Sequence, residues 1–371
     1  MDYYVGIISG TSMDAIDAVL VDYSTMPGKI IATCSEPMPD DIRSDFGLLQ
    51  LVPSNPFTFL LLGKLEVQIG KAFAQTVNKL LQATNLQKVH IKAIGSHGQT
   101  VWHQPDGENP FTIQIGDPNI IAEETGITTV ADFRRRDMAV GGQGAPFAPV
   151  FHEALFRNAA EDRIVLNLGG IANISVLPKN LEKPITGFDT GPANTLSDLW
   201  TQKYLSKSFD ENGHWAASGC INEGLLKLML KDPYFDRPNP KSTGREYFNF
   251  VWIDKNLQSF NTSVKPADVQ ATLVELTALT VLKGIQQCGL TSGSLYVCGG
   301  GAKNCHLMER IRYHVATFKI LSTCELGIPA EWMEALAFAW FAKNTINGQS
   351  VNLTNVTGAR KAVILGGIYQ S

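Results

Sequence analysis

The sequence predicts a mixed α/β protein built from two related domains, and three observations carry that prediction. Apolar strand segments alternate with segments of helical periodicity, which is typical of mixed α/β domains. The chain has 371 residues, more than one hydrophobic core usually serves. A unit of strand, small polar turn and strand opens each half of the chain, which indicates duplication of a whole domain rather than a short repeat.

The two repeated units share one design. Tyr3–Ile8 is an apolar segment, a small polar turn follows, and Ala18–Val21 is apolar again. In the second half, Ile164–Leu168 leads into Gly169-Gly170, and Ile174–Leu177 returns. Glycine takes positive φ without steric cost, so such turns suit tight reversals. A single unit would most often be a plain β-hairpin, whereas two of them favour a duplicated domain.

The remaining elements follow from periodicity and from breaker residues. Helices are expected over 45–83, 120–124, 195–204, 223–231, 266–288, 304–315 and from 329 to about 340. Further strands are expected over 92–95, 111–115, 128–131, 295–298 and 362–365. Residues 132–149, rich in glycine, proline and charge, predict a loop that crosses between domains, and 232–249 predicts an extended loop.

Composition limits the possible partners. Hydrophobic residues make up 44% of the chain and charged residues 18%, and the net charge is −4. This charge gives no general attraction to nucleic acid or to an anionic membrane, and no apolar run reaches the ~20 residues of a membrane span. The six cysteines form no C-x-x-C pair, which disfavours structural zinc. Without a segment of signal-peptide form, we expect a reduced, cytoplasmic protein.

Both turns have the composition of a phosphate site. Gly10, Thr11 and Ser12 allow the backbone to approach a phosphate closely, and Asp14 or Asp17 could hold a water of Mg²⁺. A simple turn with an aspartate bond to its own backbone is the alternative. The second hairpin combines Gly169 and Gly170 with Asn173, and it contains no Walker A motif. A tight structural hairpin remains the alternative there.

Asp189 follows the second hairpin, on what the flanking Gly187 and Gly191 predict to be a turn. A carboxylate beside a phosphate-binding hairpin suits phosphoryl transfer, because it can act on the nucleophile. It could instead cap the helix expected at Thr195. Gly299, Gly300 and Gly301 stand between a strand and a helix, where they suit either a nucleotide contact or a packing turn.

Three further groups could recognise a sugar or an anion. Arg134, Arg135 and Arg136 could clamp a carboxylate or phosphate, or form a solvated cluster. The segment 96–103 places Gln99 and two histidines beside a tryptophan, which suits sugar recognition or a structural loop. Glu334 lies in an otherwise apolar run at the start of the last helix, where it could also simply favour the helix dipole.

The order of these motifs matches the superfamily of actin-like ATPases and sugar kinases, and more closely the sequence resembles the anhydro-N-acetylmuramic acid kinase family. The matching segments are SGTSMDAID (9–17), SHGQTVWH (96–103), ADFRRRDMAVGGQGAP (131–146), NLGGIANIS (167–175), GFDTGPAN (187–194), DPYF with PKSTGREYFN (232–249), VCGGGAKN (297–304) and EALAFAWFA (334–342). Ala15 and Ala193 stand where the family more often has glycine.

The resemblance implies two ribonuclease-H-like domains with mixed sheets, flanked by helices around an ATP cleft. The first would cover 1–131 plus about 345–371, and the second 132–344. The implied reaction takes 1,6-anhydro-N-acetylmuramic acid, ATP and water to N-acetylmuramic acid 6-phosphate and ADP, in cell-wall recycling. ATP and Mg²⁺ would be the cofactors, and the enzyme would be a homodimer with no nucleic-acid or membrane partner.

The resemblance also implies roles for single residues. Asp189 would be the catalytic base, and Arg134, Gln99 and Glu334 would address the sugar. The ATP contacts would be Gly10, Thr11, Ser12, Met13, Asp14, Ala15, Ile16, Asp17, Gly169, Gly170, Asn173, Gly299, Gly300 and Gly301. No residue is assigned as a metal ligand. One carboxylate would suffice because the γ-phosphoryl group captures the leaving O6, in place of the acid that a glycosidase uses.

Two other functions fit the same motifs. A sugar kinase of this fold could act on an ordinary hydroxyl, and a preference for an open hexose would identify it. A catalytically silent sugar sensor could bind ATP without releasing ADP, although the intact Asp189 argues against that interpretation.

Overall fold

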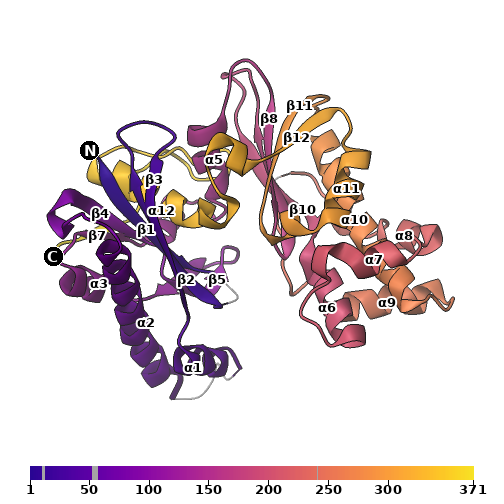
Figure 1. The fold of residues 1–371 in the computed structure, drawn as a ribbon, viewed down its shortest axis with the longest axis horizontal. Coiled ribbons are helices and arrows are strands. Elements are labelled where there is room, and N and C mark those ends of the chain that lie inside the picture. The colour runs from indigo at the N-terminus through magenta and orange to yellow at the C-terminus, as the bar shows by residue number, and fades with distance from the viewer. Residues whose placement is uncertain (11–12, 52–56, 240) are drawn as a thin grey trace. The chain divides into compact units, whose positions relative to one another are not determined.

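The chain forms two compact units in a computed structural model that describes residues 1–10, 13–51, 57–239 and 241–371. The first unit comprises Met1–Leu155 and Trp332–Ser371, and the second comprises Phe156–Glu331 (Figure 1). The observed limits therefore differ from the expected division at 131/132 and 344/345. The first unit extends to Leu155 instead of residue 131, and it resumes at Trp332 instead of residue 345.

A six-stranded sheet forms the core of the first unit, in the order β13-β7-β4-β1-β2-β3. Its strands are β1 (Tyr3–Ser9), β2 (Ala15–Asp22), β3 (Lys29–Pro37), β4 (Ile91–Ser96), β7 (Thr129–Ala131) and β13 (Gly367–Tyr369). The first three strands are antiparallel neighbours, β4 runs parallel to β1, and β7 runs parallel to β4. A separate two-stranded ribbon pairs β5 (Gln99–Gln104) with β6 (Phe111–Ile115).

The second unit repeats this topology in a five-stranded sheet of order β10-β9-β8-β11-β12. Its strands are β8 (Arg163–Leu168), β9 (Ile171–Leu177), β10 (Thr186–Pro192), β11 (Gly293–Cys298) and β12 (Phe318–Ser322). Again three antiparallel strands are followed by two parallel ones on the side of the first strand. This shared order and direction is what duplication of a ribonuclease-H-like domain predicts, and both predicted hairpins are confirmed.

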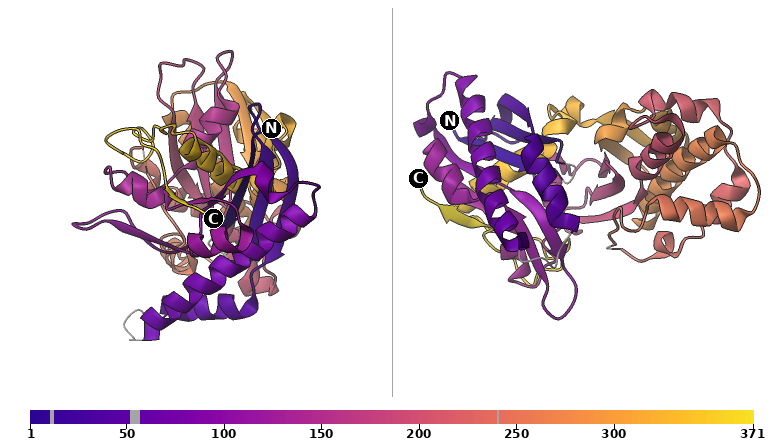
Figure 2. Two further views of the ribbon diagram at one scale, coloured as in Figure 1. Left: turned by 90° about the vertical axis from the view of Figure 1, so that its left-hand side faces the viewer. Right: turned by 90° about the horizontal axis from the view of Figure 1, so that it is seen from below.

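Two helices cover opposite faces of the first sheet. The helices of this unit are α1 (Asp40–Leu51), α2 (Phe57–Gln82), α3 (Pro118–Thr125), α4 (Phe133–Met138), α5 (Ala148–Phe156) and α12 (Met333–Ile346). The predicted apolar stripe of α2, from Leu65 to Leu80, is fully buried. The ribbon of α2 runs along the sheet of this unit (Figure 2). On the other face, α12 lies directly on Gly6 and Gly95, which are paired neighbours on β1 and β4. A side chain on either glycine would meet the α12 backbone.

Residues 132–149 are not the predicted loop throughout, because helix α4 lies within them and α5 begins there. Composition suggested a loop, yet the segment contributes buried aromatic side chains to the first unit. Phe133 and Phe147 pack against Phe341 of α12, with ring centroids 5.8 and 5.4 Å apart. This packing overrides the local glycine and proline signals and extends the first unit past residue 131.

The predicted strand at 362–365 is also wrong. Val363 forms only an isolated bridge with Val351, and the last strand of the sheet is β13, from Gly367 to Tyr369. Its partner β7 is three residues long, so it offers few positions for pairing. Gly366 has a φ of +79°, which turns the chain between the apolar run and the strand.

Helix α10 is the central helix of the second unit. The helices of this unit are α6 (Asn194–Leu205), α7 (His214–Ser218), α8 (Glu223–Met229), α9 (Phe250–Phe260), α10 (Pro266–Gln287) and α11 (Cys305–His314). One side of α10 packs on the sheet and α11, and its N-terminal half packs on a second, aromatic-rich cluster with α6, α8 and α9. Short 3₁₀ turns occur at 88–90, 211–213, 233–236, 300–303, 323–326 and 330–332.

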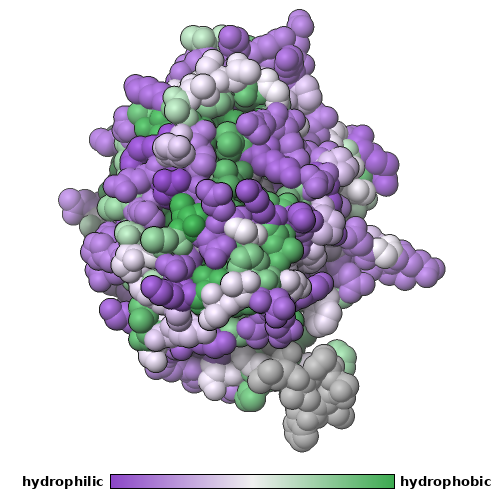
Figure 3. All heavy atoms as spheres, turned by 90° about the vertical axis from the view of Figure 1, so that its right-hand side faces the viewer, coloured by the Kyte–Doolittle hydropathy of each residue, from purple (hydrophilic) through white to green (hydrophobic). Residues whose placement is uncertain are grey.

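The molecular surface is mostly hydrophilic on the face of Figure 3, with hydrophobic residues between the polar ones. The exposed large apolar side chains of the second unit include Phe209 and Val251, at 58% and 74% exposure. Among the described residues, none of the helices combines the length and hydropathy that a bilayer-spanning segment needs. The six cysteines all lie within the described residues, and none of them forms a disulfide bond.

Candidate active site

Asp189 lies in strand β10 and not on the predicted turn. It pairs with Asn173 of β9, and the register shifts between Asp189 and Gly191. Such a bulge bends the strand and re-aims the side chain next to it. The N-cap of α6 is Ala193, without a side-chain cap. The alternative interpretation of Asp189 as a helix cap is therefore wrong.

Residues of the loop 232–249 hydrogen-bond to the carboxylate and to the backbone of Asp189. The Thr243 N–H donates to Asp189 Oδ2 at 2.9 Å, and the Asp189 N–H donates to the Lys241 carbonyl at 3.0 Å. The Tyr234 hydroxyl donates to the Asp189 carbonyl at 2.8 Å. Burial raises the pKa of the Asp189 carboxyl to about 6, the Thr243 bond opposes that shift, and nearby Glu246 adds to it. A partly accessible carboxylate with this pKa suits a general base near neutral pH.

Two charged groups, the partly buried Asp232 and the buried Lys241, hold that loop in place. The Asp232 carboxylate accepts bonds from the Tyr247 hydroxyl at 2.8 Å and from Trp252 Nε1 at 2.7 Å. The Lys241 ammonium donates to the Phe235 carbonyl at 3.1 Å and is only 8% exposed. The loop that contacts Asp189 is therefore anchored at both ends, although its sequence predicts only an extended segment.

The tip of the second hairpin hydrogen-bonds to the backbone N–H groups at the start of α6. The Gly170 carbonyl accepts the N–H groups of Ala193 and Thr195, at 2.9 and 3.1 Å, and the Gly169 carbonyl accepts that of Asn194 at 3.1 Å. A Cβ atom at residue 170 would lie 2.7 Å from Thr195 Oγ1, so the close approach requires glycine. The hairpin thus presents carbonyls to the helix.

A pocket of about 490 Å³ begins beside this tip, within the range of small-ligand sites. Its walls come from α6, from the turn after β11 and from the 3₁₀ turn before α7. The lining residues are Asn194, Asp198, Phe209, Asp210, Glu211, Asn212, Gly300, Gly301, Lys303 and Asn304. Gly299, at the end of β11, has a φ of +83°, and a side chain there would meet Asn167 of β8. The structure therefore places the glycine turn directly beside the second hairpin.

The acidic residues of the pocket differ in availability. Both oxygens of Asp210 are used, since they accept the N–H groups of Trp215 and Ala216 at 2.9 Å each. The Asp198 carboxylate makes no hydrogen bond with the residues that the structure describes. Burial raises the pKa of the Asp198 carboxyl to about 6, partly offset by Arg245. Asp198 is thus a free acceptor in the pocket, and sequence reasoning missed it because nothing local marks it.

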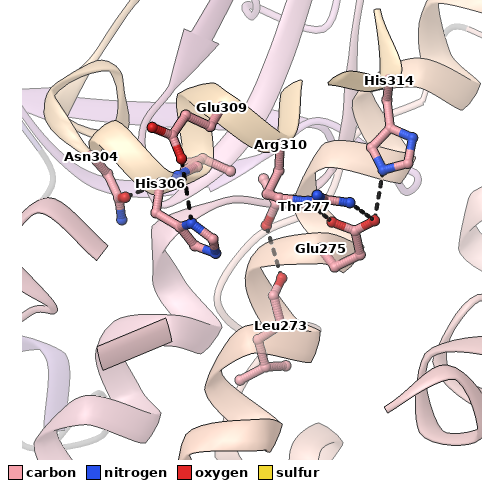
Figure 4. Close-up of polar contacts among 9 residues, drawn as sticks. Leu273, Glu275, Thr277, Asn304, His306, Glu309, Arg310 and His314 are labelled. Atoms are coloured by element: carbon pink, nitrogen blue, oxygen red, sulfur yellow. Dashed lines mark hydrogen bonds and ion pairs between the residues drawn. The ribbon is translucent and has the colours of Figure 1, made fainter. Parts of the chain in front are cut away.

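An ion-pair network holds helix α11 against α10, and α11 begins at the part of the pocket wall that its N-cap Asn304 forms (Figure 4). Glu275 of α10 accepts Arg310 Nε at 2.6 Å and Arg310 Nη2 at 2.9 Å, and it contacts His314 Nε2 at 2.6 Å. At the other end of α11, Asn304 accepts the Leu307 N–H at 3.0 Å. Because Asn304 lines the pocket, the network and the cap together position that wall.

In the first unit, Arg134 of α4 is held by His97. Arg134 Nε donates to His97 Nε2 at 2.9 Å, and Arg134 Nη1 donates to the Gly144 carbonyl at 3.2 Å. A guanidinium cannot accept a hydrogen bond, so His97 Nε2 must be the acceptor and the ring proton is on Nδ1. His97 Nδ1 therefore donates to the Gly98 carbonyl oxygen, which lies 2.9 Å from it. Burial and the Arg134 charge lower the pKa of His97 to about 3, so the ring stays neutral.

Several polar atoms near His97 have no partner. Gln99 of β5 is 1% exposed, and its Oε1 has no hydrogen-bond partner among the described residues. The same is true of the hydroxyls of Ser9 and Ser96, at the ends of the neighbouring strands β1 and β4. Glu334, in the first turn of α12, is close enough to interact electrostatically with Arg134. Three predicted sugar contacts, Gln99, Arg134 and Glu334, thus belong to the same unit.

The first hairpin is described only in part, because Thr11 and Ser12 lie outside the described residues. Gly10 O accepts the Met13 N–H at 3.0 Å, and Met13 has a φ of +53°. Met13 and Ile16 have core side chains, at 3% and 1% exposure, so only their backbones are available to a ligand. Asp14 is exposed, and Asp17 Oδ1 accepts the Ser35 hydroxyl at 2.7 Å.

The two alanines that depart from the family pattern cause no backbone strain. Ala193 has a φ of −109°. Ala15 begins β2 and is not among the residues with positive φ. Neither position needs the left-handed conformation that would favour glycine.

The sequence model of the family described as "Anhydro-N-acetylmuramic acid kinase" matches residues 2–371. The chain belongs to this family. It is 51% identical over 366 residues to an anhydro-N-acetylmuramic acid kinase of Coxiella burnetii (strain Dugway 5J108-111), covering 99% of this chain and 97% of the relative. It is 48% identical over 368 residues to that of Pasteurella multocida (strain Pm70), covering 99% and 96%. The family prediction from the motifs is confirmed.

Solved structures with similar folds are more distant. One is the activator of 2-hydroxyisocaproyl-CoA dehydratase from Clostridium difficile with bound ADPNP, with a TM-score of 0.45, 13% identity and coverage of 93% and 96%. Another is a ROK family glucokinase from Streptomyces griseus in complex with glucose and AMPPNP, with a TM-score of 0.39, 12% identity and coverage of 91% and 98%.

Proposed function

We propose that this chain phosphorylates O6 of 1,6-anhydro-N-acetylmuramic acid while water opens its anhydro bridge. The products are N-acetylmuramic acid 6-phosphate and ADP, and the role is in cell-wall recycling. One observation carries the proposal at the level of the site: Asp189 is a partly accessible carboxylate, with a pKa near 6, beside a glycine hairpin. Family membership supplies the substrate.

Asp189 acts in this proposal as the base for water. Its carboxylate takes a proton from water, whose oxygen attacks the anomeric carbon as the bond from C1 to the bridging oxygen breaks. That oxygen remains on C6 and forms a bond to the γ-phosphorus of ATP, and ADP leaves. The Thr243 N–H holds Oδ2 of Asp189, which orients the carboxylate and leaves Oδ1 for the water.

The pocket in the second unit is the proposed site of the nucleoside. Gly300 and Gly301 allow close approach of a ligand to the backbone, and Asp198 is a free acceptor that suits a ribose hydroxyl. The volume of about 490 Å³ accommodates a nucleoside. Gly169, Gly170 and Asn173 lie at or beside the hairpin, where the phosphates would follow.

Mg²⁺ fits the carboxylates of the first hairpin. Mg²⁺ keeps several waters and takes only one or two protein carboxylates beside substrate phosphates. Asp14 is exposed without a hydrogen bond to any described side chain, and Asp17 keeps one carboxylate oxygen free of the Ser35 bond. These two residues would hold the ion or its waters. When bound, the ion would neutralise phosphate charge.

The sugar would be recognised in the first unit. Burial lowers the pKa of Arg134 only to about 10, so its guanidinium stays cationic and can pair with the lactyl carboxylate of a muramic acid. The unpaired Gln99 Oε1 is available to a sugar hydroxyl or an amide N–H. Glu334 supplies a second acceptor near Arg134.

Isotope incorporation tests the coupled reaction. The enzyme is incubated briefly with the anhydro-sugar, ATP and Mg²⁺ in ¹⁸O-water, and the product is analysed by mass spectrometry. We expect one ¹⁸O at C1 and none in the phosphate. A parallel incubation of N-acetylmuramic acid 6-phosphate without enzyme corrects for spontaneous exchange at C1. Product that lacks ¹⁸O beyond this control would exclude the water attack.

We also propose a cytoplasmic homodimer. Six cysteines without a disulfide bond are compatible with a reducing compartment, and the dimer rests on the family resemblance alone. Light scattering coupled to size-exclusion chromatography tests it. A mass near 40.5 kDa at micromolar concentration would contradict the dimer.

A further inference from the structure

One cation at the tip of the second hairpin has no assigned task. Arg245 belongs to the loop that also holds Asp189, and its side chain reaches back over the hairpin. Its Nε and Nη2 atoms lie 3.4 and 3.5 Å from the position that a Cβ atom on Gly170 would take. The side chain is exposed and makes no hydrogen bond or ion pair with the residues that the structure describes, although its charge acts on the Asp198 carboxyl of the pocket.

A buried hydroxyl without a partner lies at the same place. Thr195, in the first turn of α6, is 6% exposed, and its Oγ1 makes no hydrogen bond among the described residues. The Gly170 Cβ position is 2.7 Å from this oxygen, so Thr195 and Arg245 approach the hairpin tip together. An unpaired buried hydroxyl destabilises the fold, and a ligand that pairs it recovers that loss.

The backbone donors of α6 do not account for this site. The N–H groups of Ala193, Asn194 and Thr195 are already bound to hairpin carbonyls. A ligand at the tip therefore meets the Arg245 guanidinium and the Thr195 hydroxyl, together with the positive end of the helix dipole. All three favour an anion, and a guanidinium can bind two oxygens of one phosphate side by side.

We propose that Arg245 is a catalytic residue that binds oxygens of the phosphoryl group during its transfer, with Thr195 as a second donor. Phosphoryl transfer depends on positioning and on charge stabilisation. Arg245 reaches the hairpin tip and follows Thr243, whose N–H holds the Asp189 carboxylate, by two residues, so its charge is available to a phosphoryl group bound at that tip. This inference rests on the proposed function, because it assumes that phosphates lie at the hairpin.

The competing anion is the carboxylate of the sugar, and kinetics separates the two. A phosphoryl contact made in the transition state lowers kcat, whereas a carboxylate contact raises KM for the sugar and leaves kcat unchanged. We compare the wild type with Arg245→Ala and Arg245→Lys. Arg312→Ala is the matched control, because Arg312 is an exposed arginine in the last turn of α11, outside the pocket lining.

We expect kcat of Arg245→Ala to fall about 10²–10³-fold, as for loss of one donor to a developing oxyanion. KM for the sugar should stay within about twofold, and Arg245→Lys should recover only part of the loss, since a lysine cannot bind two oxygens in a fixed fork. Added guanidinium at millimolar concentration should restore part of the activity of Arg245→Ala. Thr195→Val should lower kcat by a smaller factor.

Three outcomes would overturn the proposal: an unchanged kcat in Arg245→Ala, a rise confined to KM for the sugar, or no rescue by guanidinium in a variant that melts like the wild type. Asp189→Asn is measured alongside. Loss of turnover in Arg245→Ala with full turnover in Asp189→Asn would remove Asp189 from the base role and leave the arginine in place. The reverse result would remove only the arginine.

Discussion

The two sheets have the same order and directions, yet their carboxylates stand on different strands. The innermost pairs of the two hairpins are Ser9 with Ile16 and Leu168 with Ala172. One residue further along the second strand is Asp17 in the first unit and Asn173 in the second. Their partners on the third strand are Ser35 and Asp189. The acid therefore moves from the second strand to the third.

The surroundings of the two acids differ as well. Asp17 is hydrogen-bonded to the side chain of Ser35 on the next strand. Asp189 is covered by residues from the 232–249 loop, which donate to its carboxylate and carbonyl. Burial raises the pKa of its carboxyl to about 6, although the bond from Thr243 opposes that shift. The comparison teaches that a common sheet supplies the position of each acid, whereas burial beneath the covering loop gives Asp189 the raised pKa that suits the proposed base.

Exchanging each acid for its amide tests this difference most directly. Asp189→Asn should lower kcat about 10²–10⁴-fold, because the base is lost, while nucleotide affinity is largely kept. Asp17→Asn should mainly raise the Mg²⁺ concentration that gives half-maximal rate. Steady-state kinetics and ADP binding measure both. Equal kcat losses with unchanged Mg²⁺ dependence would contradict separate roles.

The ion-pair network of α10 and α11 belongs only to the second unit, so its loss should act there first. Glu275→Gln leaves Arg310 without its bidentate partner and should lower the stability of this unit by about 2 kcal/mol, less than for a fully buried pair because Arg310 is partly exposed. Calorimetry should show a shift in the transition of the second unit. An equal shift in the melting transitions of both units would contradict the expectation that the network stabilises only the second unit.

The Glu275 carboxylate also predicts that acid lowers the stability of the folded protein. Burial raises the pKa of Glu275, but bonds from Arg310 and His314 outweigh burial and hold the pKa below its usual value. Its stabilising contribution is therefore present above the unfolded value of about 4.3 and is lost as pH falls through the lower folded value. The wild type should lose more stability than Glu275→Gln between pH 5 and 3.

Replacing glycine by alanine should destabilise the protein at the turn after β11 but not at the turn of the first hairpin. Gly299→Ala should cost about 2 kcal/mol, because its φ is +83° and the new Cβ would meet Asn167. Gly10→Ala should change the melting temperature little, since no described atom lies within 4 Å of its Cβ position. Thermal melts of both variants check this. A larger fall in melting temperature for Gly10→Ala than for Gly299→Ala would show that the first turn, and not the one after β11, requires glycine.

The pH profile of the reaction tests the raised pKa of Asp189. Asp189 must be ionised to act as a base, and its pKa is about 6 in the folded protein. The value of kcat/KM should therefore fall about tenfold per pH unit below pH 6 and level off above it. A profile that stays flat down to pH 4.5, under conditions where the protein remains folded, would contradict the raised pKa.

Local pattern determined the general plan of this protein. The two hairpins, the apolar stripe of α2, the long helix α10 and the glycine turn after β11 follow from periodicity and from glycine placement. These features depend on residues close together in the sequence. The motif order was specific enough to indicate the family, which the comparison with known proteins confirms.

Only the tertiary structure decided what each site residue touches. Asp189 obtains its bonds from Thr243 and Tyr234, 54 and 45 residues away, and Arg134 is held by His97, 37 residues away. The approach of Arg245 to the hairpin tip is of the same kind. Burial, unpaired hydroxyls and shifted pKa values arise from packing between distant segments, and no local period in the sequence records such packing.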